Sequence, residues 1–412
     1  MDCHYFIMMR QKKNLLFAVA LTGLVWCSGV SAQKKGDFTL SGYGFVDVRS
    51  YMDTRKSVAG ADDYLYLYPL NEAMINGTDV NDTKAASMFG STVRFGFNMT
   101  GPKVLGADSR ANVEFDVFNY NSSAFFLFRH CYTVFDWENS SVTLGHTWHP
   151  MGKLMPGVGS IAVGSPFNAL NRSGQLRYDF RAGDGLTFNA AAVFQSLGNA
   201  TGPLGRSFAY QRRSMIPELY AGVEWSGEHL SLAAGVEWQK ISPDTTIAGG
   251  KISNQYVESV AGMAQAVYKN GKFQAMAKTY YGQNMSQLGF CTGYGLKAGT
   301  SDKWSPLTAS SSWVFVDYGT DFKVGCFAGY MKNLGAKDNL DASKIFATGG
   351  NIDRMFRIAP NLKYKAGCTQ FCIEDDITGV SYGEVEAKGT VKGGDFVVNN
   401  RVLLAVTYLF NL

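Results

Sequence analysis

The sequence has 412 residues, of which 17% are charged and 14% aromatic, and its 38 Lys and Arg nearly balance 34 Asp and Glu. This balance argues against a nucleic-acid-binding protein, which would carry a basic stripe. Beyond a predicted leader over residues 1–32, no apolar stretch reaches about 18 residues, which excludes a helical transporter. Low charge with 46 Gly, 28 Phe and 21 Tyr is typical of a chain built from half-apolar strands.

The first 32 residues are predicted to be a signal peptide that is removed on export. A basic segment over 10–13 precedes an apolar run over 15–26, and Val30-Ser31-Ala32 has the small residues of a cleavage site. An N-terminal membrane anchor is the alternative, but the run is too short to span a bilayer. We therefore expect residues 33–412 to form a single exported domain.

From Phe38 onward, apolar side chains recur at every second position, in segments of about ten residues separated by turns. This period predicts β-strands. The sixteen predicted strands are 38–50, 90–100, 109–118, 125–136, 141–149, 174–181, 186–196, 215–225, 229–239, 256–268, 272–283, 312–318, 321–331, 353–364, 369–386 and 398–410.

The connections between these strands alternate in length. Seven are short, and six of the seven contain glycine, as tight turns require. The other connections are mostly long; they are 51–89, 119–124, 150–173, 197–214, 240–255, 284–311, 332–352 and 387–397. This plan predicts an all-β, transmembrane antiparallel β-barrel with short periplasmic turns, long extracellular loops and both termini in the periplasm.

The hairpin 215–239 shows the alternation most clearly. One face is apolar from Leu219 to Trp225 and from Leu230 to Trp238, while the other face is polar. About ten strand residues tilted near 40° rise about 25 Å, the height of the apolar band of a membrane barrel. We expect the aromatic girdles at the membrane surfaces to include Trp225, Trp238, Tyr408 and Phe410. A soluble sandwich is the alternative, but sixteen strands of one composition favour the barrel.

Charged side chains on the polar faces are predicted to face the lumen, because Arg or Lys facing lipid at mid-membrane costs about 2 to 4 kcal/mol. If Val93, Phe95 and Phe97 face lipid, Arg94 faces the lumen. The candidates for lining a constriction are Arg94, Arg110, Arg129, Arg177, Arg181, Arg357, Asp47, Glu114 and Asp116. Arginines beside carboxylates resemble a pore eyelet with a transverse field. The alternative for each arginine is a lumen residue that only pairs with Asp or Glu.

Segment 150–173 is unusually apolar and rich in small residues for an exposed loop. Such a composition indicates that the segment packs against another part of the protein. We predict that it folds into the lumen; packing on the surface or at a trimer contact is the alternative.

Few residues point to metal binding or catalysis. His146 and His149 lie three apart on a predicted strand and point to opposite faces, so we predict no metal site and no cofactor. The five cysteines beyond the leader form no CxxC pair and are interpreted as incidental strand residues. Nucleophile elbows, phosphate loops and dinucleotide fingerprints are absent, so no enzyme is predicted. A barrel hydrolase remains an alternative, because its Ser, His and acid come from separated strands.

Four short stretches carry a resemblance to a known family. They are Gly42-Tyr43-Gly44-Phe45-Val46-Asp47, Thr92-Val93-Arg94-Phe95-Gly96-Phe97, Leu127-Phe128-Arg129-His130-Cys131-Tyr132 and Leu144-Gly145-His146-Thr147-Trp148. With these stretches and this layout, the chain resembles the DcaP-like trimeric porins of the Gram-negative outer membrane. The resemblance implies a 16-strand barrel, a homotrimer and diffusion of small, often anionic solutes past lumen arginines, with Arg94 and Arg129 at matching positions. The helical N-terminal stalk of some members is missing, and His146 stands where glutamine is expected.

The predicted function is therefore that of a porin in the bacterial outer membrane, a channel for passive diffusion of small hydrophilic solutes, including anionic ones. Its expected partners are outer-membrane lipid, those solutes and further copies of the same chain, with no nucleic acid. The alternative is an outer-membrane barrel that acts as a receptor, an adhesin or a surface hydrolase.

Overall fold

The computed structural model describes residues 38–60, 64–120, 123–243, 253 and 255–412. The predicted signal peptide, 1–32, lies outside the described residues. Within the described ranges, no helix is long and apolar enough to cross a membrane.

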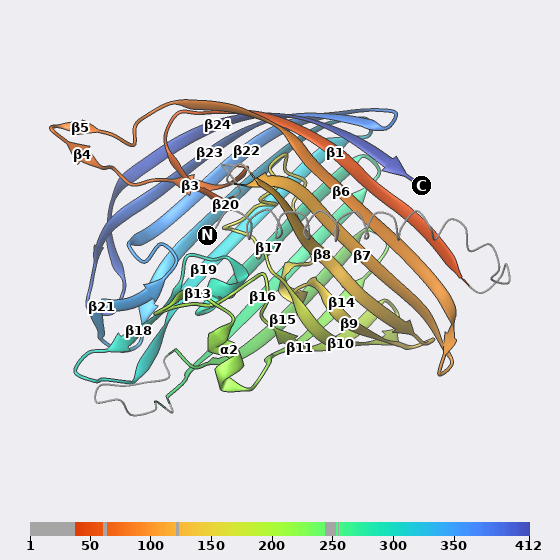
Figure 1. The fold of residues 1–412 in the computed structure, drawn as a ribbon, viewed down its shortest axis with the longest axis horizontal. Coiled ribbons are helices and arrows are strands. Elements are labelled where there is room, and N and C mark those ends of the chain that lie inside the picture. Colours follow the sequence, from red (N-terminus) through yellow and green to blue (C-terminus); the bar gives the residue numbers. More distant parts are fainter. Residues whose placement is uncertain (1–37, 61–63, 121–122, 244–252, 254) are drawn as a thin grey trace, which may run out of the picture.

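The described strands form one large antiparallel sheet that closes on itself. β1 pairs with β6 on one side and with β24 on the other, and Figure 1 shows red β1 between orange β6 and blue β24. The sheet has 18 strands, and sixteen of them, all except β18 and β21, form the barrel wall. The predicted sixteen-strand barrel is thus confirmed, because each predicted strand overlaps one strand of the wall.

The wall strands are β1 (Thr39–Asp53), β6 (Ala85–Val104), β7 (Ala107–Tyr120), β8 (Ser123–Asp136), β9 (Ser140–Trp148), β10 (Arg172–Gly183), β11 (Leu186–Phe194), β14 (Glu218–Ser226), β15 (Leu230–Ile241), β16 (Val257–Asn270), β17 (Phe273–Gln283), β19 (Trp304–Gly319), β20 (Phe322–Ala336), β22 (Ile352–Ala366), β23 (Thr369–Val385) and β24 (Val391–Asn411). The connections contain β2 (Ser57–Gly60), β3 (Leu65–Pro69), β4 (Met74–Ile75), β5 (Thr78–Asp79), β12 (Thr201–Gly202), β13 (Gly205–Arg206), β18 (Gly293–Lys297), β21 (Leu340–Ala347), the helix α2 (Ala209–Ser214) and the 3-10 turns η2 (Pro150–Gly152) and η3 (Met285–Leu288).

The outer surface of the wall is apolar. Along β24, Val402, Leu404 and Val406 are exposed, while the alternating Leu403 and Ala405 are buried inside. An exposed apolar belt on a closed barrel is the surface that contacts lipid, and the alternate side chains then face the lumen.

Tight turns join the strands at one end of the barrel. Leu105 and Gly106 between β6 and β7 have φ of +50° and +81°, and Asp184 and Gly185 between β10 and β11 have φ of +49° and +76°. Two successive positive φ values are those of a type I′ turn, whose twist matches that of a β-hairpin. Figure 1 places these turns on the right and the longer connections on the left.

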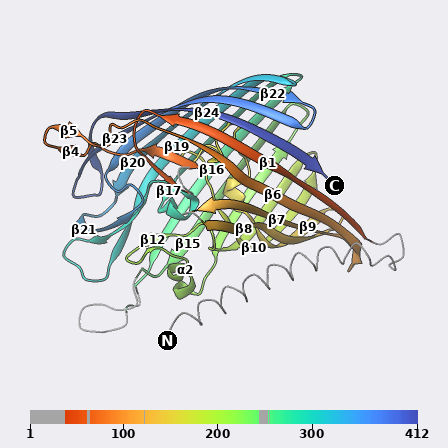
Figure 2. The same ribbon diagram turned by 45° about the horizontal axis from the view of Figure 1, so that its top comes forward.

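The longer connections gather at the opposite end. There β18 pairs with β21, extending the sheet beyond the wall, and β4 pairs with β5 in a hairpin that projects outward (Figures 1 and 2). One connection expected to be long is short. The predicted loop 387–397 is mostly strand, because β23 and β24 stay paired as far as Val385 and Val391.

Candidate functional site in the barrel lumen

The segment 149–171 lies against inward-facing side chains of the wall. Tyr280 Oη on β17 and Trp313 Nε1 on β19 donate hydrogen bonds of 2.8 and 3.1 Å to Asn168 Oδ1. Lys278 Nζ on β17 donates to the carbonyl oxygen of Met151 at 2.7 Å. These donors are buried, so the segment is held to one side of the barrel interior.

The middle of the same segment is fixed by β22 and β23. Arg357 Nη1 donates to the Ser165 carbonyl oxygen at 3.0 Å, and Lys363 Nζ donates to the Gly157 carbonyl oxygen at 2.6 Å. Glu374 accepts the backbone N–H of Ser160 at 2.9 Å. These hydrogen bonds from wall side chains satisfy backbone N–H and C=O groups of the segment. The segment has little regular structure of its own that could satisfy them.

A cavity of about 490 Å³ lies between this segment and the wall strands β1, β6, β7, β8, β9 and β10. The charged residues in its lining are Arg49, Arg94, Arg129, Arg172, Glu114 and Asp116. The cavity is therefore rich in arginine, and its charge depends on which arginines the carboxylates neutralise.

Arg94 and Arg129 share two carboxylates. Arg94 holds Asp116 with two hydrogen bonds, Nε to Oδ1 at 2.7 Å and Nη2 to Oδ2 at 3.0 Å. Arg129 bridges both acids, with Nε 2.7 Å from Glu114 Oε1 and Nη1 2.8 Å from Asp116 Oδ2. Each guanidinium thus makes two hydrogen bonds to carboxylate oxygens, which fixes its plane. The two positive charges are balanced by two negative charges.

A β-bulge explains the position of Arg129. Glu114 on β7 lies opposite His130, but the next residue, Phe115, lies opposite Phe128, which leaves Arg129 as an extra residue in β8. A bulge lets neighbouring side chains turn to the same side of a sheet. Arg129 and His130 accordingly both line the cavity.

Tyr43 holds the second oxygen of Glu114. Its Oη donates to Glu114 Oε2 at 3.0 Å and accepts from Asn112 Nδ2 at 2.9 Å. The Tyr43 ring crosses Gly96 on β6, where an added Cβ would lie 2.1 Å from the ring Cζ. Gly96 is therefore required for Tyr43 to reach the carboxylate.

Asp47 and Arg49 form a second pair at the edge of the cavity. Asp47 accepts hydrogen bonds from Arg49, from Tyr64 Oη at 3.0 Å and from Thr407 Oγ1 at 2.6 Å. Burial raises the pKa of Tyr64, which lies in the connection before β3, to about 12, so this group stays a neutral donor.

Arg172, at the start of β10, has no carboxylate partner in the described part of the chain. Its Cζ lies 4.6 Å from the centroid of the Trp148 ring, and its buried Nη1 has no hydrogen-bond partner there. Because the other three cavity arginines are balanced by acids, Arg172 leaves an uncompensated positive charge. Arg172 is not among the lumen arginines predicted from the sequence, because residue 172 falls in the predicted loop 150–173, where the alternation of side chains along a strand does not apply.

The other predicted arginines lie away from the cavity lining. Arg110 and Arg181 both pair with Asp136 at 2.8 Å, beside the tight turns. Arg177 pairs with the adjacent Asp179 at 2.9 Å.

Arg357 is a buried structural residue in this arrangement. Its side chain is 2% exposed, and its Nε lies 3.0 Å from Asp376 Oδ1. Besides Ser165, it binds the carbonyl oxygen of Leu67 from the connection 54–84. Arg357 thus ties two connections to the wall.

The predicted girdle aromatics lie on the outer surface. Trp225 and Tyr408 are 38% and 51% exposed, near the tight turns. Phe410 packs on Phe95 of the outer face, with centroids 5.9 Å apart. Trp238 lies towards the other end of its strand, opposite Leu219.

A Ser–His pair without an acid is present near the cavity. Ser196 Oγ lies 3.1 Å from His146 Nδ1, but His146 Nε2 has no hydrogen-bond partner among the described residues. A hydrolase needs an acid that orients this ring. The pair therefore gives no support to the hydrolase alternative.

The closed antiparallel wall, apolar outer belt and charged interior define a class: this chain has the fold of the outer-membrane porins. No protein-family model matches the sequence, and no curated protein is significantly similar to it. Among solved structures, the outer membrane channel DcaP of Acinetobacter baumannii superposes with a TM-score of 0.68 at 15% identity, covering 92% of this chain and 99% of DcaP.

Two further structures share the fold at lower similarity. OmpT of Vibrio cholerae has a TM-score of 0.54 at 11% identity, covering 92% of this chain and 99% of its own. OmpF of Salmonella typhi, solved with daunomycin, has a TM-score of 0.52 at 11% identity, covering 91% and 98%. The resemblance to DcaP inferred from short sequence stretches is thereby confirmed for the fold.

Proposed function

We propose that the chain is a porin through which small hydrophilic solutes diffuse across the outer membrane, with a mild preference for anions. The observation that supports this most is the lumen cavity with Arg172 as its uncompensated charge. We further propose that residues 1–32 direct export and are removed, and that segment 149–171 narrows the passage beside the cavity.

Electrostatics sets the expected size of the preference. At about 4 Å and an effective dielectric constant near 20, one fixed charge attracts an anion by roughly 4 kcal/mol before desolvation is subtracted. Even a quarter of this energy changes a permeability ratio about fivefold. The paired residues Arg94, Arg129, Glu114 and Asp116 add dipoles to the passage rather than net charge.

A planar-bilayer recording of the purified protein tests the pore. We expect stepwise, ohmic conductance. In a KCl gradient, we expect a reversal potential whose sign shows that chloride permeates better than potassium. Protein that has been heat-denatured before addition is the control. A correctly folded barrel that stays electrically silent would refute the porin proposal and favour a receptor barrel.

We also propose that the protein is a homotrimer. The outer face of β6, β7 and β8 carries a cluster of phenylalanines: Phe126 and Phe128 are 44% and 54% exposed, and Phe126 lies 4.7 Å from Phe115 between centroids. Concentrated aromatic surface is typical of protein interfaces.

Paired substitutions test the assembly. Changing Phe126 and Phe128 to Ala should yield monomers in mild detergent, measured by light scattering after size exclusion. Changing Val314 and Val316 to Ala, on β19 at the opposite side of the wall, should leave the oligomer intact. A monomeric wild type, or equal behaviour of both variants, would refute this interface.

A further inference from the structure

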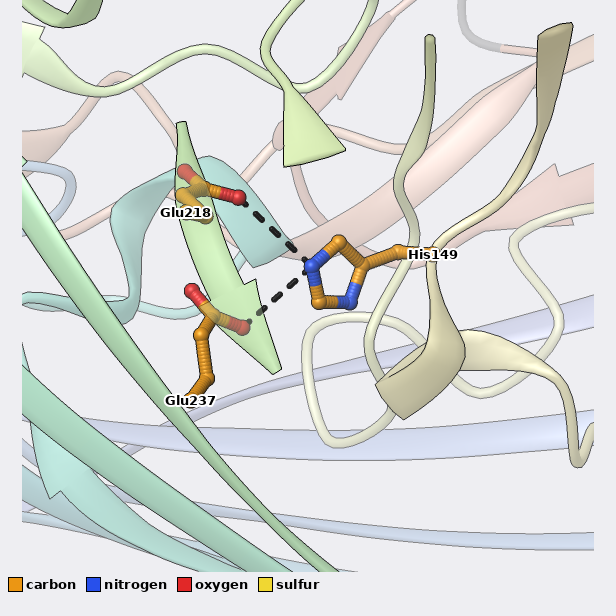
Figure 3. Close-up of side chains that lie close together, drawn as sticks. All are labelled: His149, Glu218 and Glu237. Carbon is orange, nitrogen blue, oxygen red and sulfur yellow. Dashed lines mark ion pairs between the residues drawn. The ribbon is translucent and has the colours of Figure 1, made fainter. Parts of the chain in front are cut away.

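Three buried side chains converge outside the arginine cavity. His149 Nε2 lies 3.5 Å from Glu218 Oε2 and 3.3 Å from Glu237 Oε2, and the three side chains are at most 1% exposed. Figure 3 shows both carboxylates directed at the same ring nitrogen. Their potential ligand atoms all lie within 4.8 Å of one another.

The fold brings these residues together from distant parts of the chain. Glu218 and Glu237 lie on the inward face of the β14–β15 hairpin, where Tyr220 pairs with Glu237, so the two glutamates are diagonal neighbours. His149 is the first residue after β9 and precedes η2. Residues on rigid strands hold their side chains more accurately than residues on loops, which favours a defined site.

Each carboxylate is held by an amide on its other oxygen. Gln195 Nε2 donates to Glu218 Oε1 at 2.6 Å, and Gln287 Nε2 donates to Glu237 Oε1 at 2.8 Å. Glu218 Oε2, Glu237 Oε2 and His149 Nε2 have no hydrogen-bond partner among the described residues. Outer hydrogen bonds that orient carboxylates, with one oxygen left free, are the arrangement found around bound metal ions.

The charge of the cluster, with both carboxyls ionised, also favours a cation. In the described part of the chain, neither glutamate forms an ion pair with Lys or Arg. The buried Lys278 does not pair with either glutamate; its Nζ donates a hydrogen bond of 2.7 Å to the carbonyl oxygen of Met151. Two buried carboxylates without a cation are costly, whereas one divalent ion would neutralise both.

We propose that His149, Glu218 and Glu237 bind one divalent transition-metal ion, with Zn²⁺ the best match. Imidazole nitrogen with two carboxylate oxygens is a Zn²⁺ ligand set, and water would complete a tetrahedral shell. Calcium and magnesium are disfavoured because they take oxygen ligands in larger number.

Ligation changes the protonation of the ring. Met151 N–H donates to His149 Nδ1 at 3.2 Å, so the neutral ring carries its proton on Nε2 before binding. An ion takes the Nε2 lone pair, the ring proton moves to Nδ1, and the Met151 contact is given up. The bound ion would fix the start of segment 149–171 to the β14–β15 wall.

Cobalt serves as the probe for this site, because Co²⁺ occupies Zn²⁺ sites and is visible by absorption. The folded wild-type barrel, stripped with EDTA, is titrated with Co²⁺, and Zn²⁺ is then added in competition. We expect one Co²⁺ ion to bind per chain. Its visible absorption band should be that of a four-coordinate ion with nitrogen and oxygen ligands, and no thiolate-to-metal charge-transfer band should appear. The last criterion matters because Cys131 and Cys368 are exposed and free.

Substitutions locate the ion. His149→Gln and Glu237→Gln should abolish saturable binding, and Gln287→Ala should weaken it about 10- to 100-fold by removing the outer hydrogen bond. The matched controls His146→Gln and Glu224→Gln change a histidine three residues away and a glutamate on the same hairpin face, and both should bind as the wild type does.

Three outcomes would overturn the metal site: no saturable binding by the wild type, a thiolate band, or unchanged binding in His149→Gln. Heat-modifiable gel migration verifies that each variant is folded. If the ligand variants do not fold, X-ray absorption of the Zn²⁺-loaded wild type decides: one imidazole with oxygen ligands supports the site, and sulfur or several imidazoles refutes it. None of these measurements depends on pore activity.

Discussion

The Arg172 guanidinium lies over the Trp148 indole, with its Cζ 4.6 Å from the ring centroid. Arg129 approaches the same ring at 5.8 Å, but Arg129 is also paired with two carboxylates. A cation–π contact stabilises a guanidinium by about 0.5 to 2 kcal/mol without cancelling its charge. Trp148 thus holds Arg172 in place while leaving its charge available to a solute.

The first prediction concerns this unpaired charge. Arg172→Gln should shift the reversal potential in a KCl gradient towards cation preference, because it removes the cavity arginine that has no carboxylate partner among the described residues. Arg110→Gln is the control, since Arg110 lies beside the tight turns and pairs with Asp136. An equal shift in both variants would show that the cavity does not set ion selectivity.

The second prediction concerns the paired arginines. Changing Arg94 and Arg129 together to Gln leaves Glu114 and Asp116 without their cations, so the pore should become cation-preferring by a larger margin than in Arg172→Gln. Losing a partner from a buried pair costs about 3 to 5 kcal/mol, so the double variant should also unfold at lower temperature.

The control for the paired arginines neutralises all four residues, with Glu114→Gln and Asp116→Asn added. This variant should return the reversal potential to the sign that the wild type gives. If the double and quadruple variants share one reversal potential, the four side chains lie away from the path of the ions.

The third prediction tests which side of the wall faces lipid. Val223 lies on the outer face of β14, and Ser231 lies on the inner face of β15. Val223→Arg should reduce the folded fraction in heat-modifiable gel migration, since an Arg that faces lipid costs up to about 2 to 4 kcal/mol, the value reached at mid-membrane. Ser231→Arg should fold normally. Equal damage from the two changes would contradict the assigned faces.

The barrel could be predicted because a strand has a side-chain period of two. Once Val93 and Phe95 face lipid, Arg94 must face the lumen, and in the structure Arg94 contacts Glu114 and Asp116. The alternation of side chains tells which side of the wall a residue faces. It does not tell how far along the barrel axis the residue lies, because that depends on the stagger of neighbouring strands. For this reason Arg110 and Arg177 share the predicted side yet lie outside the cavity lining.

The remaining parts of the site depend on long-range contacts. Arg172 lies at the end of a connection, where no period fixes its direction. The partners of His149 are Glu218 and Glu237, which lie far along the chain and meet it only when the barrel closes. Neither arrangement leaves a local signal in the sequence.

The last prediction concerns the attachment of segment 149–171 to the wall. Asn168 is fully buried, and its Oδ1 accepts from Tyr280 Oη and Trp313 Nε1. Tyr280 Oη can turn to the carbonyl oxygen of Met151 at 3.0 Å, so Asn168→Ala leaves the buried Trp313 Nε1 without its acceptor, at about 1 to 3 kcal/mol. The segment should then move more freely, giving noisier current and a lower unfolding temperature. Asn270→Ala, at the exposed end of β16 next to the turn into β17, is the matched control and should leave both quantities unchanged. Quiet, wild-type current from a folded Asn168→Ala variant would show that this segment does not border the conducting path, because loosening its attachment would then leave the passage unaltered.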